Sequence, residues 1–311
     1  MSAQVSGCRI GDNDAMKPIV YLMTWLGLWP VRLIGVLPLR LGRRLTGWLA
    51  WPMRKLMRRR AAIARINLSL CFPELDDAAR KRLLRRHFRH LAESLAEIAV
   101  AWQRPGRLDQ SFGEVIGLEH LEQARSEGQG VVLLTGHVTA LELGARLFGE
   151  QVMARGIYRP LRNPVLNRFQ NRGRKRYAED MLARDDLRGM VRHLRSGGVL
   201  WYAPDQDFGP DRSLFAPFFG IQTATARAII DLARMGRARV VPMIPLKDEG
   251  NGRVIVQLEP AFEDFSGNDP VADLARFNTF LEKHIRRAPA QYWWLHRRFK
   301  TRPAGQDDLY R

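Results

Sequence analysis

Apolar and polar positions follow two alternating periods from residue 129 onward. Short apolar runs predict strands, and longer segments with apolar residues at helical spacing predict helices. The expected strands cover 130–135, 152–157, 198–203, 238–244 and 253–258, and the expected helices cover 140–149, 164–178, 185–195, 223–236 and 270–287. Strand–helix alternation of this kind predicts an α/β domain.

The N-terminal part of the chain has a different pattern. Residues 18–31 carry no charge, and this region contains four tryptophans, a residue type enriched where a membrane meets water: Trp25, Trp29, Trp48 and Trp51. An uncharged stretch of this length is shorter than the roughly 20 residues that span a bilayer, but the side chain of Arg32 can reach the headgroups from a tilted helix. A spanning anchor and a half-buried interfacial helix both fit this pattern.

A basic block follows the apolar stretch. It consists of Arg40, Arg43, Arg44, Arg54, Lys55, Arg58, Arg59 and Arg60. No small-residue cleavage site separates the two, so we expect a retained anchor rather than a signal peptide. Positive charge after the anchor predicts that the body of the protein lies in the cytoplasm. A buried hairpin of core helices is the alternative for this region.

The clearest helix is expected at 76–102. Asp76 and Asp77 suit its first turn, and apolar residues recur at helical spacing from Leu83 to Ile98. Six basic residues crowd its first half, where they would face solvent or a phospholipid surface.

Charge limits the partners that this chain can have. Its 311 residues include 50 Lys and Arg against 32 Asp and Glu, a net charge of +18, which favours nucleic acid, anionic lipid headgroups or an acidic protein as partners. The chain has no recognisable nucleic-acid-binding module, so we expect no nucleic-acid partner. Cys8 and Cys71 cannot form a disulfide framework or a metal cluster, so we expect no metal site.

The first candidate for chemistry is the pair His137 and Glu142. His137 follows the expected strand 130–135, just before the expected helix 140–149. Ligands bind at such carboxyl ends of strands in open α/β sheets, and a histidine with a nearby carboxylate can act as a general base on a hydroxyl. A simpler explanation is also open, because Thr139 and Glu142 have the spacing of a capping box.

Arginines crowd the segment 155–176, and three of them are candidates for substrate binding: Arg159, Arg162 and Arg174. Guanidinium groups bind phosphate oxygens bidentately. The alternatives are a generic basic surface and an RNA-binding stripe.

Two acids, Asp205 and Asp207, follow the expected strand 198–203. Acids at the end of a strand can support a basic site. They can equally be turn formers, since Asp, Gly and Pro build turns readily.

Four segments in this order resemble the four blocks of the glycerolipid acyltransferase superfamily. They are Gly136-His137 to Glu142, Tyr158-Arg159-Pro160 with the Arg-rich helix, Pro204-Asp205-Gln206-Asp207, and Val241-Pro242 to Pro245. Within it, the chain is similar to the late (secondary) acyltransferases of lipid A biosynthesis, the HtrB/LpxL-like branch. Segments 67–74 and 292–303 resemble that branch too, and the likeness runs from about residue 17 to 303.

The resemblance implies a fold, a domain organisation and a location. The fold would be α/β, a mixed sheet flanked by helices, with an N-terminal membrane-anchoring helical segment. A flexible N-terminus over 1–16 would precede membrane anchor or interfacial helices over 17–60, an acyltransferase domain over 61–303 and a tail over 304–311. The enzyme would lie on the inner membrane of a Gram-negative bacterium, with its catalytic domain on the cytoplasmic face.

The resemblance also implies a reaction. A fatty acyl group would move from acyl-acyl carrier protein to a hydroxyacyl hydroxyl of a Kdo-lipid IVA-type precursor, on a membrane rich in anionic lipid. His137 and Glu142 match the family's catalytic pair, and Arg174 and Asp205 match functionally important residues of its second and third blocks. Arg159, Arg162 and Asp207 belong to the same blocks. No metal and no cofactor are implied.

In that reaction His137 would take the proton of the attacking hydroxyl, and Glu142 would hold the imidazole tautomer. Backbone N–H groups at the start of the helix after His137 would stabilise the thioester oxygen. No serine or cysteine nucleophile is required, so we expect direct transfer without an acyl-enzyme.

Two other functions stay open. The chain could acylate a lysophospholipid or an aminolipid, or it could be a non-catalytic basic scaffold on the membrane surface. Tyr158-Arg159-Pro160, with Asn163-Pro164 and the segment 295–300, resembles the lauroyl-adding branch more than the myristoyl-adding branch, which implies a lauroyl or similar medium-chain donor.

Overall fold

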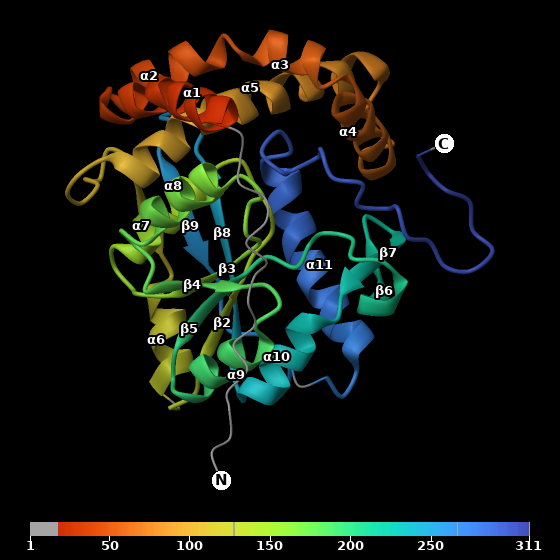
Figure 1. Cartoon of the computed structure of the whole chain (residues 1–311). Coiled ribbons are helices and arrows are strands. Elements are labelled where there is room, and N and C mark those ends of the chain that lie inside the picture. Colours follow the sequence, from red (N-terminus) through yellow and green to blue (C-terminus); the bar gives the residue numbers. More distant parts are fainter. Residues whose placement is uncertain (1–17, 127, 266, 311) are drawn as a thin grey trace.

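A seven-stranded mixed sheet forms the centre of the protein (Figure 1). The computed structural model describes residues 18–126, 128–265 and 267–310, so the expected flexible segment 1–16 and Cys8 lie outside the described residues. The strand order is β1-β9-β8-β2-β5-β3-β4, with β8 and β9 antiparallel and all other neighbours parallel. The strands are β1 (Gly113–Ile116), β2 (Val131–Leu134), β3 (Arg155–Tyr158), β4 (Asp180–Ala183), β5 (Val199–Tyr202), β8 (Arg239–Lys247) and β9 (Val254–Leu258).

Helices cover both faces of this sheet, because alternate residues of its central strands belong to different hydrophobic clusters. Val131 and Leu133 pack in one cluster, and Val132 and Leu134 pack in the other. Strand β2 is therefore fully buried, as expected for a parallel strand between two helical layers. The helices of the body are α6 (Leu118–Ser126), α7 (Leu141–Gly149), α8 (Pro164–Arg174), α9 (Leu187–Arg195), α10 (Ala228–Gly236) and α11 (Pro270–Arg287), with a short 3₁₀ helix at Pro210–Arg212.

The predicted α/β fold with a mixed sheet is confirmed, and all five expected strands are present. The expected helix 223–236 was wrong in its first part. Residues Ile221–Ala226 form β7, which pairs with β6 (Ser213–Phe218) in a separate antiparallel hairpin. The alternating threonines Thr223 and Thr225 are buried in this hairpin, where the β-branched side chains favour a strand. The expected helix 164–178 ends earlier, at Arg174.

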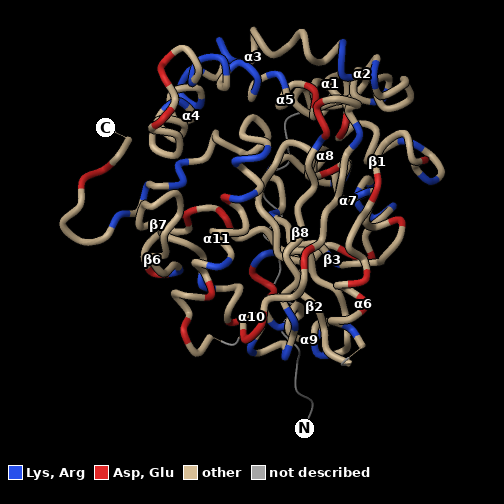
Figure 2. The backbone as a smooth tube through the Cα atoms, turned by 180° about the vertical axis from the view of Figure 1, so that it is seen from behind, with Lys and Arg blue, Asp and Glu red and all other residues tan. Residues whose placement is uncertain are grey.

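Five helices form a layer across one end of the sheet (Figure 1). They are α1 (Pro18–Val36), α2 (Leu39–Gly47), α3 (Ala50–Leu56), α4 (Arg58–Cys71) and α5 (Asp77–Gln103). Helix α5 confirms the expected helix at 76–102, and the side chain of Asp76 caps it by accepting a hydrogen bond from the Ala79 N–H at 2.5 Å. Lys and Arg concentrate along α3, α4 and α5 (Figure 2).

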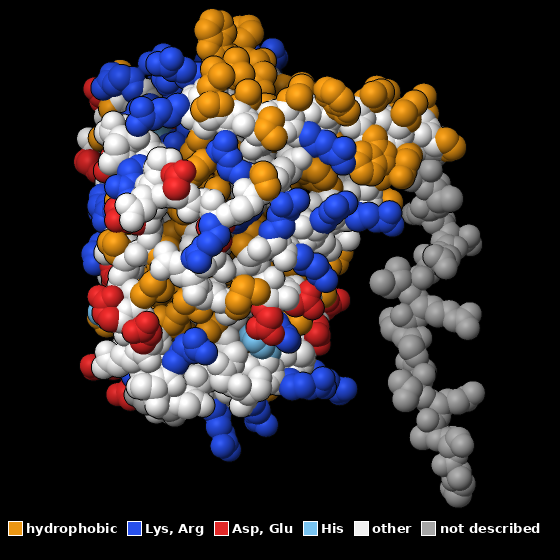
Figure 3. Space-filling view, turned by 90° about the vertical axis from the view of Figure 1, so that its left-hand side faces the viewer, with side chains coloured by type: hydrophobic (Ala, Val, Ile, Leu, Met, Phe, Trp, Pro, Cys, Tyr) orange, Lys and Arg blue, Asp and Glu red, His pale blue; other side chains and the backbone are white. Residues whose placement is uncertain are grey.

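The outer side of this layer is apolar. Among the described helices, α1 is long and apolar enough to cross a membrane by length and composition, and only 11% of its apolar window is buried. That burial is low for a core helix, which argues against the buried hairpin. Trp48 is 85% exposed and Leu56 is 89% exposed. Figure 3 shows the resulting rim of apolar side chains with basic side chains below it.

The chain returns to the helical layer after α11. The Asn67 amide of α4 donates hydrogen bonds of 2.8 Å to the carbonyl oxygens of Trp294 and His296, and the Tyr310 hydroxyl donates to Asn67 Oδ1 at 2.5 Å. The two segments that resemble the lipid A branch thus lie against each other. We refer to residues 291–301 as the C-terminal strap.

Candidate active site

The parallel pairing of β2 with β5 brings His137 and Asp205 together. Leu134, the last residue of β2, pairs with Tyr202, the last residue of β5. His137 and Asp205 each lie three positions beyond these residues. Because parallel neighbours end at the same edge of a sheet, the two side chains meet at the carboxyl ends of the central strands.

Asp205 holds His137 at two points. Its Oδ1 lies 2.5 Å from His137 Nδ1, and its Oδ2 accepts a hydrogen bond of 2.8 Å from the His137 backbone N–H. A carboxylate only accepts hydrogen bonds, so Nδ1 carries the proton and Nε2 keeps its lone pair. The side chain of Asp205 is 2% exposed and that of His137 is 29% exposed. The base is therefore accessible, while the acid that orients it is buried.

Gly136 allows this close approach. A Cβ at this position would lie 2.7 Å from Leu281 Cδ2 and 3.2 Å from Asp205 Oδ2. A larger residue at Gly136 would therefore crowd the acid that orients His137.

The charges of the pair support each other. Burial disfavours the imidazolium, but attraction to Asp205 and the hydrogen bond with it outweigh this effect, so the pKa of His137 lies above its ordinary value of 6.5. Burial also raises the pKa of Asp205, but the charge of His137 and two hydrogen bonds from it lower that pKa to about 2. Asp205 is therefore ionised at neutral pH, and a positive charge on His137 is stabilised.

Glu142 does not take the position that the sequence predicted for it. Among the hydrogen bonds of the described residues, none joins it to His137. Its carboxylate instead accepts hydrogen bonds from Trp102 Nε1 at 2.7 Å, from the Tyr177 hydroxyl at 3.0 Å and from the Arg174 guanidinium. Asp205, not Glu142, therefore orients His137. Asp205 is distant from His137 in the sequence, but the pairing of β2 with β5 brings the two side chains together.

The capping box is also absent. Helix α7 begins at Leu141 with Ala140 as its N-cap, and no side chain caps it. Glu142 lies in the first turn and reaches outward to α5 and α8.

The half-buried Glu142, Arg174 and Trp102 form one cluster with the buried Tyr177. Burial raises the pKa of Glu142, but the charge and hydrogen bonds of Arg174, with bonds from Trp102 and Tyr177, hold that pKa below its ordinary value. The guanidinium carbon of Arg174 also lies 6.0 Å from the centre of the Trp102 ring. Arg174, expected to bind substrate, therefore already has an anionic partner. Trp102 and Tyr177 were not predicted, since their spacing in the sequence carries no signal.

The other predicted site residues lie in different surroundings. Asp207 is buried and accepts hydrogen bonds from the Thr301 N–H at 2.7 Å and the Thr301 hydroxyl at 2.8 Å, so it fixes the C-terminal strap. Arg159 and Arg162 are exposed, and neither forms an ion pair with another described residue. No group of His, Cys, Asp and Glu within the described ranges could hold a metal ion.

The C-terminal strap clamps the loop that carries His137. The Trp293 N–H donates to the His137 carbonyl oxygen at 3.0 Å, and the Thr139 N–H donates to the Gln291 carbonyl oxygen at 2.8 Å. The fully buried Gln291 side chain bonds both the N–H and the C=O of Lys247 in β8, at 2.8 and 2.7 Å. His137 is thus fixed through its backbone as well as through Asp205.

Comparisons with known proteins identify the family of this chain. Residues 11–301 match the family of bacterial lipid A biosynthesis acyltransferases. The chain is 41% identical over 292 residues to the lipid A biosynthesis lauroyltransferase of Escherichia coli K12, a match that covers 93% of this chain and 95% of that protein. It is 38% identical over 297 residues to the palmitoleoyltransferase of the same strain, again over 93% and 95% of the two chains.

A more distant relative and one solved structure also match the chain. The chain is 32% identical to the lipid A biosynthesis myristoyltransferase of Escherichia coli K12, over 94% of this chain and 91% of that one. The crystal structure of the lysophosphatidic acid acyltransferase PlsC from Thermotoga maritima matches with a TM-score of 0.38 at 13% identity, over 82% of this chain and 99% of that one, which is too little to support an argument. The family match and the three relatives show that the chain belongs to the bacterial lipid A biosynthesis acyltransferases.

Proposed function

We propose that this lipid A acyltransferase moves a medium-length fatty acyl group, lauroyl or similar, from acyl-acyl carrier protein to a hydroxyacyl hydroxyl of a Kdo-lipid IVA-type acceptor. The observation that carries this proposal is the His137–Asp205 pair, an accessible base held by a buried acid. The reaction would take place on the cytoplasmic face of the inner membrane, with α1 and the apolar rim in the bilayer. The exposed Arg159 and Arg162 are candidate contacts for the phosphates of the acceptor.

His137 acts on the acceptor hydroxyl. Its Nε2 removes the hydroxyl proton as the oxygen attacks the thioester carbonyl carbon, and Asp205 stabilises the imidazolium that forms. The carbon–sulfur bond then breaks, and the imidazolium returns the proton to the leaving thiolate of the carrier. An ester and a free thiol result, and no acyl-enzyme is formed. The N-terminal N–H groups of α7, which no side chain caps, are candidates for holding the oxyanion.

Glu142 and Arg174 support the site rather than act as its base. We propose that their cluster fixes the start of α7 against α5 and α8, and thereby fixes the loop that precedes α7. In this proposal Glu142 acts as a positioning residue that stabilises the fold around the site.

Acceptor choice tests the proposal. Purified protein in detergent should acylate Kdo-lipid IVA from lauroyl-acyl carrier protein, and His137→Ala should abolish transfer while membrane binding persists. Better acylation of lysophosphatidic acid or of an aminolipid would favour the alternative acyltransferases. Unchanged transfer by His137→Ala would contradict the proposed base. Mass spectrometry of lipid A from a host that lacks late acyltransferases would identify the chain added.

A further inference from the structure

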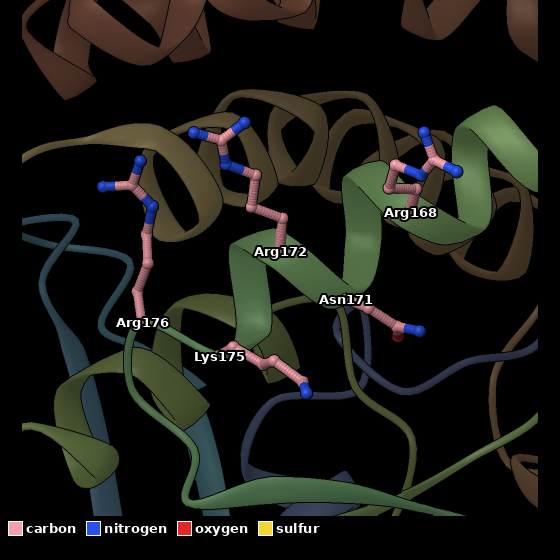
Figure 4. A pocket seen from close by; sticks show the side chains of 5 residues that line it. All are labelled: Arg168, Asn171, Arg172, Lys175 and Arg176. Carbon is pink, nitrogen blue, oxygen red and sulfur yellow. The ribbon is translucent and has the colours of Figure 1, made fainter.

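Helix α8 has two basic sides with different surroundings. Arg174 points inward to Glu142, whereas Arg168, Arg172 and Arg176 are exposed. The three exposed arginines are spaced four residues apart, so they form one row, with about 6 Å of rise between neighbours along the helical part. Figure 4 shows that Arg168 and Arg172 extend from one side of α8 toward the N-terminal helices, and that Arg176, on the turn after α8, extends in the same direction, while Asn171 and Lys175 point elsewhere.

The row has no anionic partner among the residues that the structure describes. Other cations nearby are paired: Lys175 Nζ lies 3.3 Å from Asp180 Oδ1, and Arg155 Nη2 lies 2.6 Å from Glu179 Oε1. The row borders a shallow depression of about 540 Å³ that Asn171 and Lys175 also line. Three like charges that lie side by side and unpaired favour an external anion.

The position of the row identifies the kind of anion. Asn163, the N-cap of α8, donates a side-chain hydrogen bond of 3.0 Å to Thr24 Oγ1 of α1, which ties α8 to the candidate membrane helix. Two apolar side chains near the start of α8, Leu161 and Leu166, are 42% and 37% exposed. Figure 3 shows a band of basic side chains directly below the apolar rim on this side of the molecule. A bilayer that covers the rim would bring its headgroups to the level of this band.

We propose that Arg168, Arg172 and Arg176 form a docking surface for the phosphate groups of anionic membrane phospholipids. The row would set the depth and tilt of the enzyme on the bilayer, beside the candidate active site. An acidic carrier protein fits this surface less well, because the row faces the apolar rim rather than open solvent. The inference rests on the proposed membrane location and does not depend on which acyl chain or acceptor the enzyme uses.

A matched pair of variants tests this surface. Arg168→Gln/Arg172→Gln removes two charges from α8, and Arg188→Gln/Arg192→Gln removes two exposed arginines with the same spacing from α9, at the opposite end of the molecule (Figure 1). Flotation of the full-length protein with vesicles of phosphatidylcholine alone, or with added phosphatidylglycerol, gives the preference for anionic lipid. The ratio of the two affinities cancels the apolar contribution of α1, which is common to both vesicles.

The wild type and the α9 variant should have the same preference for phosphatidylglycerol. The preference of the α8 variant should be about 25-fold lower, about five-fold for each arginine removed. The wild-type preference should also fall as salt rises. Equal preferences in all three proteins would overturn the proposal. The proposal would also be overturned if the α8 variant kept the wild-type preference but had a raised KM for the phosphorylated acceptor or for the acyl carrier protein. The row would then bind a substrate. A wild type that prefers phosphatidylglycerol but transfers no acyl group, with that preference lost in the α8 variant, would contradict the proposed function and support this surface.

Discussion

Two carboxylates, the buried Asp205 and the half-buried Glu142, lie near the loop of His137 and have different partners. Asp205 follows a strand and bonds His137 through both oxygens, whereas Glu142 begins a helix and bonds Arg174, Trp102 and Tyr177. One acid therefore raises the basicity of a reactive group, and the other neutralises a fixed cation. Nearness in the sequence favoured Glu142 as the partner of His137, but the order of the strands in the sheet selects Asp205.

The largest expected effect comes from His137→Ala, which removes the proposed base that Asp205 orients. General-base catalysis contributes about 10²–10⁴-fold, so kcat/KM for acyl transfer should fall by about that factor. Circular dichroism and vesicle binding should match the wild type. A variant with more than a tenth of wild-type activity would contradict the role of His137.

Asp205→Asn should come next, with a loss of kcat/KM within the same range of about 10²–10⁴-fold, because the amide cannot stabilise the imidazolium. It should also shift the pH profile. The base must be neutral, and Asp205 raises the pKa of His137, so the acid limb of the wild-type profile should lie above the ordinary value of 6.5. Without the carboxylate this limb should move to lower pH. An unmoved limb would show that Asp205 does not act on His137.

Glu142→Gln should act mainly on stability. It leaves the half-buried Arg174 guanidinium without its anion, which costs about 3 kcal/mol of unfolding free energy, the lower end of the range for a buried pair. Activity should fall with the loss of folded protein, but the acid limb should stay in place because Glu142 does not bond His137. Denaturant unfolding measures the stability, and a pH profile of kcat/KM measures the position of the acid limb. A limb that moves as it does in Asp205→Asn would restore Glu142 as the partner of His137.

A double variant sharpens this third prediction. Glu142→Gln/Arg174→Met removes both charges, so it should recover part of the stability lost in Glu142→Gln alone. Failure of the double variant to recover any stability would contradict the ion pair as the source of the loss.

The smallest expected effect is that of Gly136→Ala. The new methyl group would press on Leu281 and on Asp205 Oδ2, and such overpacking costs about 1–3 kcal/mol. Thermal unfolding should detect the loss, and kcat should fall more than KM rises, since the methyl group displaces Asp205. A variant as stable and as active as the wild type would show that the loop has room at this position.

The sequence allowed the main strands and the position of His137 to be predicted, because apolar runs and the helix boundary are local properties. It also placed Asp205 after a strand. It could not show that β2 and β5 are neighbours, since strand order depends on the whole chain, and so it paired His137 with the nearest acid. The β6–β7 hairpin was read as the start of a helix for a similar reason, because its alternating Thr and Ala residues form a strand only with the help of a partner.

The C-terminal strap has a consequence for the order of synthesis. Residues 291–293 hold the loop of His137, and Asn67 of α4 holds the following residues. The ribosome makes the N-terminal helices before the strap, and domains generally fold as units once enough of the chain has emerged. The loop of His137 therefore receives these supports only after every helix from α1 to α11 has been synthesised. A nascent chain already held at the membrane would stay without activity until that moment.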